Sequence, residues 1–232
     1  MLLSIDTSTL TLSVALVVRS SSGIQVLEHF TRGPPKKQSE LLPAAIRTLL
    51  AVHRVSLADL EGIAIGLGPG SFTGLRIGLS TAKGLSYAAK LPLSGVSSLA
   101  AIALEGPRDT PLFPTAPARQ GELYIGEYLR RAQGVEEVGP ERAIAPGELA
   151  DLLRRSPEAV ALGPGVSAFW DHLHLLGISE RQMRATPLFP SAVAVAQLAR
   201  LGKGYDEASV FAMEPHYVRL SPAETAALSS KG

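Results

Sequence analysis

The sequence has no cysteine, which excludes disulfide bonds and thiolate metal sites. It has no long hydrophobic run either, since no segment reaches the roughly 18 uninterrupted apolar residues of a membrane span. The first residues, Met1–Asp6, carry no basic leader. The 22 basic and 21 acidic residues leave a formal net charge of +1, whereas nucleic-acid surfaces are usually strongly basic. These absences predict a cytoplasmic protein that binds no membrane and has no dedicated nucleic-acid surface.

The chain is long and apolar enough to bury a sizeable core. Its 232 residues are 46% hydrophobic, with a mean hydropathy of +0.19, and fit one large domain or two small lobes. Hydrophobic periodicity in the first hundred residues predicts three strands, followed by alternating helices and strands. Strands are expected at 2–6, 11–18, 24–29, 62–66 and 91–96, and helices at 39–53, 72–90 and 97–104.

A less regular region begins near Glu105, where proline and polar residues interrupt this pattern. Strands at 122–130 and 159–162, helices at 146–155 and 191–201, and an extended stretch at 210–221 are expected there. We therefore predict a first lobe over 1–104, completed by a helix at 190–203. A smaller, less regular second lobe is predicted over 105–189, and an extended C-terminal segment with a frayed end over 204–232.

The most informative segment is Gly66–Gly78, which has five glycines in thirteen residues between an apolar run and a helical pattern. Backbone N–H groups in such a turn favour a phosphate. Gly74, Gly78, Ala82 and Ser86 recur every four residues, so they form a small-residue groove on the helix. Each internal glycine costs about 1 kcal/mol relative to alanine, which contacts outside the helix must offset. A second helix can pack in this groove, either from the same lobe or across a subunit interface.

Five segments together resemble the TsaB (YeaZ) family over nearly the whole chain. They are Leu3–Ser8, Leu12–Leu16, Gly68–Gly78, Gly95–Leu99 and Glu214–Arg219. The resemblance implies the two-lobed α/β fold of actin, Hsp70 and sugar kinases (ASKHA). It also implies a part in forming N6-threonylcarbamoyladenosine in tRNAs that read codons beginning with A, as a non-catalytic structural or allosteric subunit. The implied partners are TsaD, the catalytic subunit, in a heterodimer, and TsaE, with a homodimer when TsaD is absent.

Nucleotides in this fold class lie between the lobes, held by a phosphate hairpin from each lobe and by carboxylates that orient Mg²⁺. Asp6, Thr7 and Ser8 are the candidates in the first hairpin, but Ser8 stands where a glycine would let phosphate approach. The second hairpin, Thr115–Gly121, has no acidic residue. We therefore expect no tightly bound cofactor, and ATP or ADP only at the level of the complex. The alternative for Asp6 is a structural role, accepting N–H bonds of its own turn.

Metal and peptidase chemistry find little support in the residues. The catalytic paralogue has a histidine pair where this chain has Gln38–Glu40, and the spacing of His172 and His174 does not put both on one helix face. Gly70–Gly74 does not have the spacing of the G-x-S-x-G nucleophile elbow. We predict no metal site and no catalytic residue. An autonomous ATP-dependent kinase or ATPase and a metallopeptidase-like hydrolase are the alternative functions.

The two helices expected at 39–53 and 72–90 are the predicted contact surface for TsaD. The interface residues predicted on them are Leu42, Ile46, Leu49, Gly74, Arg76, Gly78, Ala82 and Ser86. Replacing Gly74 or Gly78 by leucine is expected to weaken the assembly and leave the fold intact.

Overall fold

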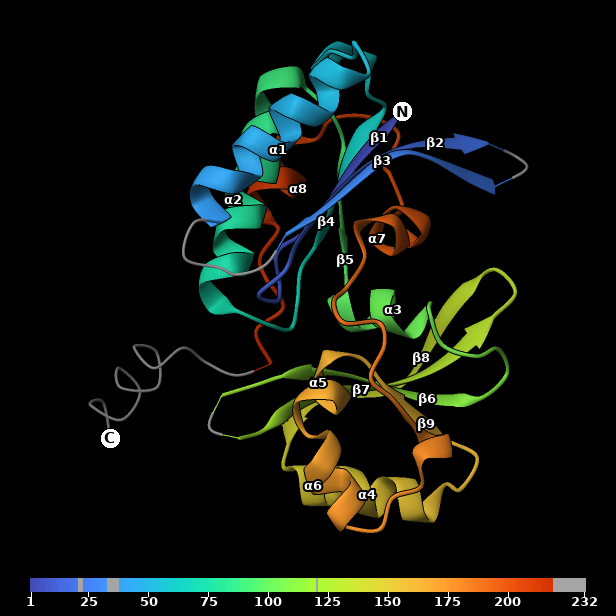
Figure 1. The fold of residues 1–232 in the computed structure, drawn as a ribbon. Helices are drawn as coiled ribbons and strands as arrows, with labels where there is room; N and C mark the ends of the chain where they lie inside the picture. The colour runs from blue at the N-terminus through green and yellow to red at the C-terminus, as the bar shows by residue number, and fades with distance from the viewer. Residues whose placement is uncertain (21–22, 33–37, 120, 219–232) are drawn as a thin grey trace.

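The computed structural model describes residues 1–20, 23–32, 38–119 and 121–218, which form two lobes, each built on a five-stranded sheet (Figure 1). The first sheet has the order β3-β2-β1-β4-β5, with β1 (Leu2–Asp6), β2 (Leu12–Ser20), β3 (Gly23–Arg32), β4 (Gly62–Gly66) and β5 (Leu93–Val96). The second has the order β10-β9-β6-β7-β8, with β6 (Pro111–Pro117), β7 (Leu123–Arg131), β8 (Gly134–Ile144), β9 (Val160–Leu162) and β10 (Met183–Arg184).

Both sheets have the same topology. In the first, β1, β2 and β3 form an antiparallel meander, while β4 and β5 add to β1 in parallel. In the second, β6, β7 and β8 form the meander, while β9 and β10 add to β6 in parallel. By this topology β6 is the counterpart of β1, and β9 is the counterpart of β4. The predicted fold class, a two-lobed α/β fold of the actin type, is confirmed.

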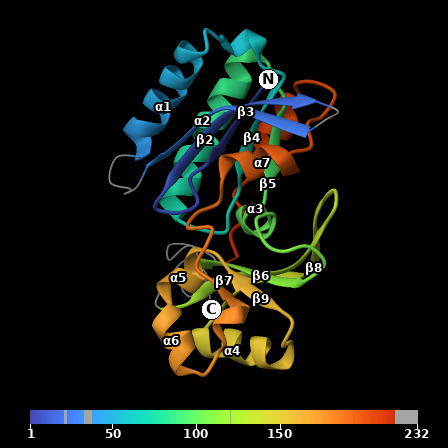
Figure 2. The same ribbon diagram turned by 45° about the vertical axis from the view of Figure 1, so that its right-hand side comes forward.

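Helices cover both faces of the first sheet, and a short helix lies at the junction of the lobes (Figures 1 and 2). Their bounds are α1 (Gln38–Val52), α2 (Phe72–Ala89), α3 (Ser98–Ala103), α4 (Pro146–Arg155), α5 (Pro164–Ala168), α6 (Trp170–Leu175), α7 (Ala192–Leu198) and α8 (Glu207–Ala212), with short 3₁₀ turns η2 (Leu57–Asp59) and η3 (Glu180–Gln182). The pair α1 and α2 packs on one face of the first sheet, and α7 packs on the other. Helix α3 lies against the second sheet, and α8 lies against α2.

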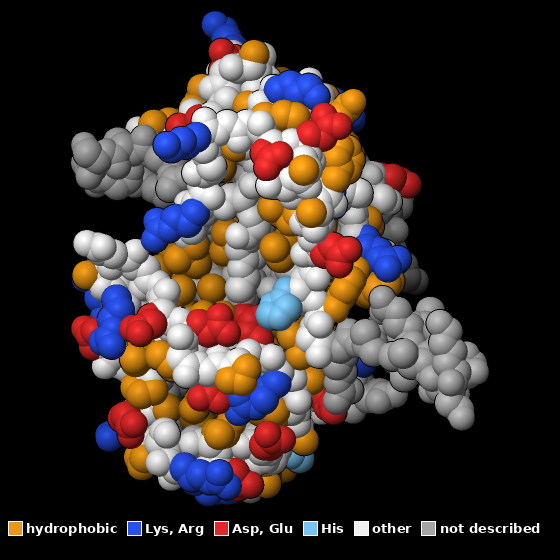
Figure 3. Space-filling view, turned by 180° about the vertical axis from the view of Figure 1, so that it is seen from behind, with side chains coloured by type: hydrophobic (Ala, Val, Ile, Leu, Met, Phe, Trp, Pro, Cys, Tyr) orange, Lys and Arg blue, Asp and Glu red, His pale blue; other side chains and the backbone are white. Residues whose placement is uncertain are grey.

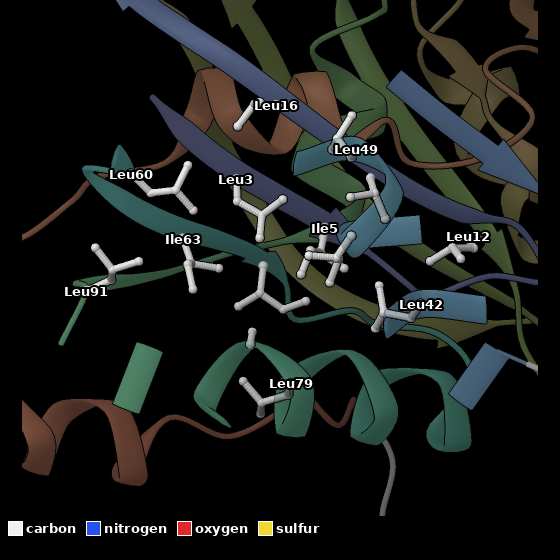
Figure 4. Close-up of a cluster of buried hydrophobic side chains, with 14 residues drawn as sticks. Leu3, Ile5, Leu12, Leu16, Leu42, Leu49, Leu60, Ile63, Leu79 and Leu91 are labelled. Atoms are coloured by element: carbon white, nitrogen blue, oxygen red, sulfur yellow. The ribbon is translucent and has the colours of Figure 1, made fainter. Parts of the chain in front are cut away.

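The core of the first lobe lies between its sheet and the helix pair (Figure 4). Leu3 and Ile5 of β1 meet Leu42 of α1 and Leu79 of α2 there. Strands β1 and β4 are buried along their whole length because helices cover both faces of the sheet. Their sequences are accordingly apolar on both faces, which is why both strands could be predicted with their correct ends. No helix in the described residues is long and apolar enough to span a membrane.

The second lobe and the C-terminal region differ most from expectation. Strand β6 has three prolines in seven residues, which lowers its strand propensity, and it was not predicted. Strand β8 and the helices α5 and α6 were missed as well. The extended segment expected over 204–232 is wrong at Glu207–Ala212, which form α8, because the Asp206 side chain accepts a hydrogen bond from the Ala208 N–H and caps that helix. Residues 219–232 lie outside the described residues.

Candidate functional site at the lobe junction and the outer face of α2

Asp6 ends β1 with both carboxylate oxygens buried and hydrogen-bonded. Its Oδ1 accepts from the backbone N–H of Ser8 at 2.9 Å and from the Ser8 hydroxyl at 2.7 Å. Its Oδ2 accepts from the Ser98 hydroxyl of α3 at 2.7 Å. Burial raises the pKa of Asp6 to about 6, although these hydrogen bonds act in the opposite direction. The contacts support the structural role for Asp6, because the carboxylate closes its own turn and ties that turn to α3.

The glycine loop after β4 packs directly against the Asp6 turn. A Cβ atom on Gly66 would lie 1.9 Å from Asp6 Oδ2, and one on Gly70 would lie 2.1 Å from the Ser8 carbonyl oxygen. The same carbonyl accepts a hydrogen bond from the Ser71 N–H at 2.6 Å. Glycine is needed at Gly66 because the buried Asp6 carboxylate fills the space of a Cβ, and at Gly70 because the backbone of Ser8 approaches its own backbone. The two loops are in contact, so a phosphate would have to separate them before reaching the loop N–H groups.

The second lobe has a hydroxyl, that of Thr115, in place of this carboxylate, and its partners lie at the end of β9 and in α5. Thr115 of β6 is fully buried, and its Oγ1 donates to the Leu162 carbonyl at 3.0 Å and accepts from the Val166 N–H at 2.9 Å. A Cβ on Gly165 would lie 2.7 Å from that Oγ1. The sequence held a signal for this repeat, since Gly163-Pro-Gly165 follows β9 as Gly68-Pro-Gly70 follows β4.

The small-residue groove of α2 faces the interior of its own lobe. It is formed by Gly74, Gly78, Ala82 and Ser86, all of which are buried. A Cβ on Gly78 would lie 2.2 Å from Thr7 Oγ1 and 3.2 Å from Ile65 Cδ1. The Thr7 hydroxyl also donates to the Gly74 carbonyl at 2.8 Å. The expectation that a second helix fills this groove is wrong at Gly78, because the neighbours there are the turn after β1 and the strand β4.

The predicted interface residues lie mostly inside the first lobe. Leu42, Ile46, Leu49, Gly74, Gly78, Ala82 and Ser86 are buried, and Arg76 is exposed. A partner could not reach the buried side chains in this conformation. The interface on α1 and α2 stays a prediction, and it has to use exposed residues. Those of the two helices are Ser39, Glu40, Arg47, Thr48, Ala51, Val52, Thr73, Arg76, Ser80, Gly84, Tyr87 and Ala88.

Glu141 of β8 links three parts of the chain at the lobe junction. Its Oε1 accepts hydrogen bonds from the Ser97 hydroxyl and, at 2.6 Å, from the Tyr128 hydroxyl. Its Oε2 lies 2.9 Å from Nδ1 of His216, and only 1% of the Glu141 side chain is exposed. Burial raises the pKa of Glu141, while the Ser97 and Tyr128 hydrogen bonds act against that rise. The carboxylate thus joins the N-terminus of α3, the second sheet and the C-terminal segment.

These polar groups do not have the arrangement of a serine hydrolase. In a nucleophilic triad the histidine lies between the serine and the carboxylate. Here the carboxylate of Glu141 lies between Ser97 and His216. The Ser97 hydroxyl also accepts hydrogen bonds from the N–H groups of Leu99 and Ala100 as the N-cap of α3. The group therefore holds the lobes together and has no geometry for acyl transfer.

A pocket of about 390 Å³ opens between β5, α3, the end of α7 and the β7–β8 hairpin. Figure 3 shows the back of the molecule hollowed where the lobes meet, with acidic side chains and a histidine close by. The charged residues lining the pocket are Arg131, Glu136, Glu137 and Arg200. Arg131 pairs with Asp109 and Glu136, so the lining has no clear preference for one sign of ligand charge.

Within the described ranges, no group of three or more histidine, cysteine, aspartate or glutamate side chains could hold a metal ion. His172 and His174 are exposed on α6, and His174 Nε2 lies 4.0 Å from Glu180 Oε1.

Comparison with known proteins identifies the family. The family model described as "TsaD: tRNA N6-adenosine threonylcarbamoyltransferase" matches residues 34–166. The tRNA threonylcarbamoyladenosine biosynthesis protein TsaB of Bacillus subtilis is 31% identical over 237 residues, covering 99% of each chain. TsaB of Escherichia coli is 35% identical over 175 residues, covering 73% of this chain and 74% of the relative.

Two solved structures agree with these relatives. YeaZ from Pseudomonas aeruginosa superposes with a TM-score of 0.71 at 25% identity, covering 93% of this chain and 98% of the other. A protein described as similar to peptidase YeaZ from Pseudomonas aeruginosa gives a TM-score of 0.74 at 26% identity, covering 94% and 99%. The relatives match in both sequence and fold over most of the chain, so this protein belongs to the TsaB (YeaZ) family.

Proposed function

We propose that this protein is a non-catalytic subunit in the formation of N6-threonylcarbamoyladenosine on tRNA, and that it acts by forming a heterodimer with TsaD. Its relatives are named as threonylcarbamoyladenosine biosynthesis proteins, and the matching family model carries the name of the transferase TsaD. In this proposal TsaE is a further component, the tRNA binds mainly to other subunits, and ATP or ADP acts at the level of the complex.

The geometry of Asp6 is the observation that carries the non-catalytic role. An ATPase of the actin class needs carboxylates that face a nucleotide between the lobes. Here the Asp6 carboxylate is buried with three hydrogen bonds, and its counterpart in the second lobe is Thr115. The residues that would hold Mg²⁺ and phosphate hold the protein's own loops instead.

The glycine at position 84 supports the proposal that a partner binds to the helix pair α1 and α2. A glycine inside a helix costs about 1 kcal/mol relative to alanine. The cost of Gly78 is explained by its contact with Thr7, whereas a Cβ on Gly84 would meet nothing within 4 Å in the described chain. Val52, which is 66% exposed at the end of α1, adds an apolar side chain to the same helix pair. A helix of a partner that approaches α2 closely at Gly84 accounts for the choice of glycine there.

The substitution Gly84→Arg tests this interface. Its matched control is Gly147→Arg in α4 of the second lobe, where a Cβ would likewise meet nothing within 4 Å. Both variants should keep the circular dichroism spectrum of the wild type. We expect Gly84→Arg to lose co-purification with TsaD and to shift the mass in light scattering toward the monomer when TsaD is absent. Wild-type binding of TsaD by Gly84→Arg would contradict the interface.

A tRNA modification assay tests the function itself. TsaD and TsaE, with the remaining reaction components, are assayed for threonylcarbamoyladenosine with and without this chain, and we expect the product to depend on it. Asp6→Asn should retain the activity, because Asp6 has a structural part in this proposal. Tight binding of Mg·ATP by the isolated protein, abolished by Asp6→Ala in calorimetry, would instead favour an autonomous ATPase.

A further inference from the structure

Residues Tyr205–Val218, here called the strap, run beside α2 in the opposite direction to the helix (Figure 1). At the C-terminal end of α2, Lys90 Nζ lies 3.7 Å from Glu207 Oε2 and 4.6 Å from the centre of the Tyr205 ring. The same ammonium group lies 4.1 Å from the centre of the Tyr87 ring. The strap therefore begins where α2 ends.

The middle of the strap is α8, which also packs on α2. Lys83 Nζ donates to the carbonyl of Phe211 at 2.8 Å, and the Phe211 ring meets Tyr87 edge to face with centroids 5.7 Å apart. Val210 is buried, and Met213 packs against the core of the first lobe. The strap is thus a folded part of the first lobe and contacts the ring of Tyr87, which stays 46% exposed.

The last residues of the strap divide their contacts between α2 and the lobe junction. Tyr217 accepts a hydrogen bond from Arg76 Nε at 3.2 Å, and its ring lies 5.3 Å from that of Phe72. The neighbouring His216 donates its backbone N–H to the Leu67 carbonyl at 2.8 Å. Its ring Nδ1 lies 2.9 Å from Oε2 of Glu141 in the second lobe. Two adjacent residues therefore contact the start of α2 and the second lobe.

The junction end is the stronger of the two attachments. The Lys90–Glu207 pair is more than half exposed, and exposed ion pairs contribute little because water screens them. Glu141 is almost fully buried, and its Oε2, which makes no hydrogen bond of standard geometry, lies 2.9 Å from Nδ1 of His216, so water screens this contact less than the Lys90–Glu207 pair. A change at Glu141 should for that reason affect the strap more than a change at Lys90.

We propose that the strap couples the second lobe to α2. A displacement of β8 moves the carboxylate beside His216, and the shift passes along the strap to the contacts that Tyr217 and Phe211 make with α2. The consequence for TsaD rests on the proposed function, because α2 is the helix on which that proposal places TsaD. The coupling itself is a property of the isolated protein.

Hydrogen–deuterium exchange on the full-length protein tests the coupling. The perturbation is Glu141→Gln, which lies in the second lobe and keeps the shape of the side chain. The reporters are the N–H groups of Val210 and Met213, which donate to Asp206 and Ser209 at the far end of the strap. We expect their exchange to rise about tenfold, the change that corresponds to one lost interaction with a charged group. Exchange that rises only at 215–218 and stays at the wild-type rate in α8 would overturn the proposal.

His216→Ala is the second variant, and His174→Ala is its matched control. The His216 side chain is 49% exposed, so its removal leaves no closed cavity. His216→Ala should therefore raise the exchange of α8 as Glu141→Gln does. His174 is exposed on α6 and should leave α8 unchanged. A response of α8 to both histidine variants alike would refute a specific link through His216. Because exchange needs no TsaD, a failed modification assay with a responsive α8 would refute the proposed function and leave the strap standing.

Discussion

Two glycines of α2, Gly78 and Gly84, should respond in opposite directions to the same substitution. Both lie inside one helix, where alanine is favoured over glycine by about 1 kcal/mol. A Cβ on Gly78 would lie 2.2 Å from Thr7 Oγ1, whereas a Cβ on Gly84 would meet nothing within 4 Å. The surroundings therefore decide the sign of the change in the free energy of unfolding.

The cost at Gly78 follows from the position of Thr7. The Thr7 side chain is fully buried, and its hydroxyl donates to the Gly74 carbonyl at 2.8 Å, so it cannot move away without losing that hydrogen bond. Overpacking costs about 1–3 kcal/mol and a lost hydrogen bond about 1 kcal/mol, against about 1 kcal/mol gained in helix propensity. We expect Gly78→Ala to lower the free energy of unfolding by about 1–3 kcal/mol, and Gly84→Ala to raise it by about 1 kcal/mol.

Thermal unfolding followed by circular dichroism measures both changes. For a chain of this length, 1 kcal/mol corresponds to about 2–4 °C in Tm. Gly78→Ala should melt below the wild type and Gly84→Ala above it. If Gly78→Ala melts at or above the wild-type temperature, the close packing of α2 on the Thr7 turn is refuted. The same reasoning revises the expectation for Gly78→Leu, which should now disrupt the first lobe before it affects any assembly.

Two further substitutions test the buried polar groups. Burial raises the pKa of Asp6 from 3.8 to about 6, so its contribution to stability is full below the lower value and is lost as the pH rises through the upper one. The loss amounts to about 3 kcal/mol. Chemical denaturation across this pH range should show that the difference in unfolding free energy between the wild type and Asp6→Asn changes with pH. A difference that stays constant would contradict the raised pKa of Asp6. Ser97→Ala should cost about 1–2 kcal/mol in the same assay, because it removes the N-cap of α3 and a hydrogen bond to Glu141. An unchanged unfolding midpoint for Ser97→Ala would mean that this cap contributes nothing to stability.

The first lobe could be predicted closely because its signals are local. The apolar run at Gly62–Gly66 and the periodic pattern that follows it correspond to β4 and α2 with almost the expected ends. The second lobe could not be predicted as well, because the prolines of β6 mask a strand that β7 and β9 hold in place from both sides. Helix α8 was missed because six residues give too short a pattern, and packing on α2 stabilises it.

The residues of the candidate site divide in the same way. Asp6, Thr7 and Ser8 could be picked out from the sequence, and the missing acidic residue in the second lobe pointed away from catalysis. Their contacts could not be predicted, because Asp6 meets Ser98 and Thr7 meets Gly74 across long stretches of chain. The link from Glu141 to His216 could not be predicted, because Glu141 stands in no motif, although His216 lies in the family segment Glu214–Arg219.

The sequence by itself determined the family, the order of elements in the first lobe and the glycine spacing of α2, because each depends on residues that are near one another in the chain. Only the tertiary structure decided what that spacing is for. Gly78 lies against the Thr7 turn and Gly84 faces outward, although both are glycines of one helix. A helix shows which residues share a face, but its packing against distant strands determines whether that face is buried in the lobe or open to a partner.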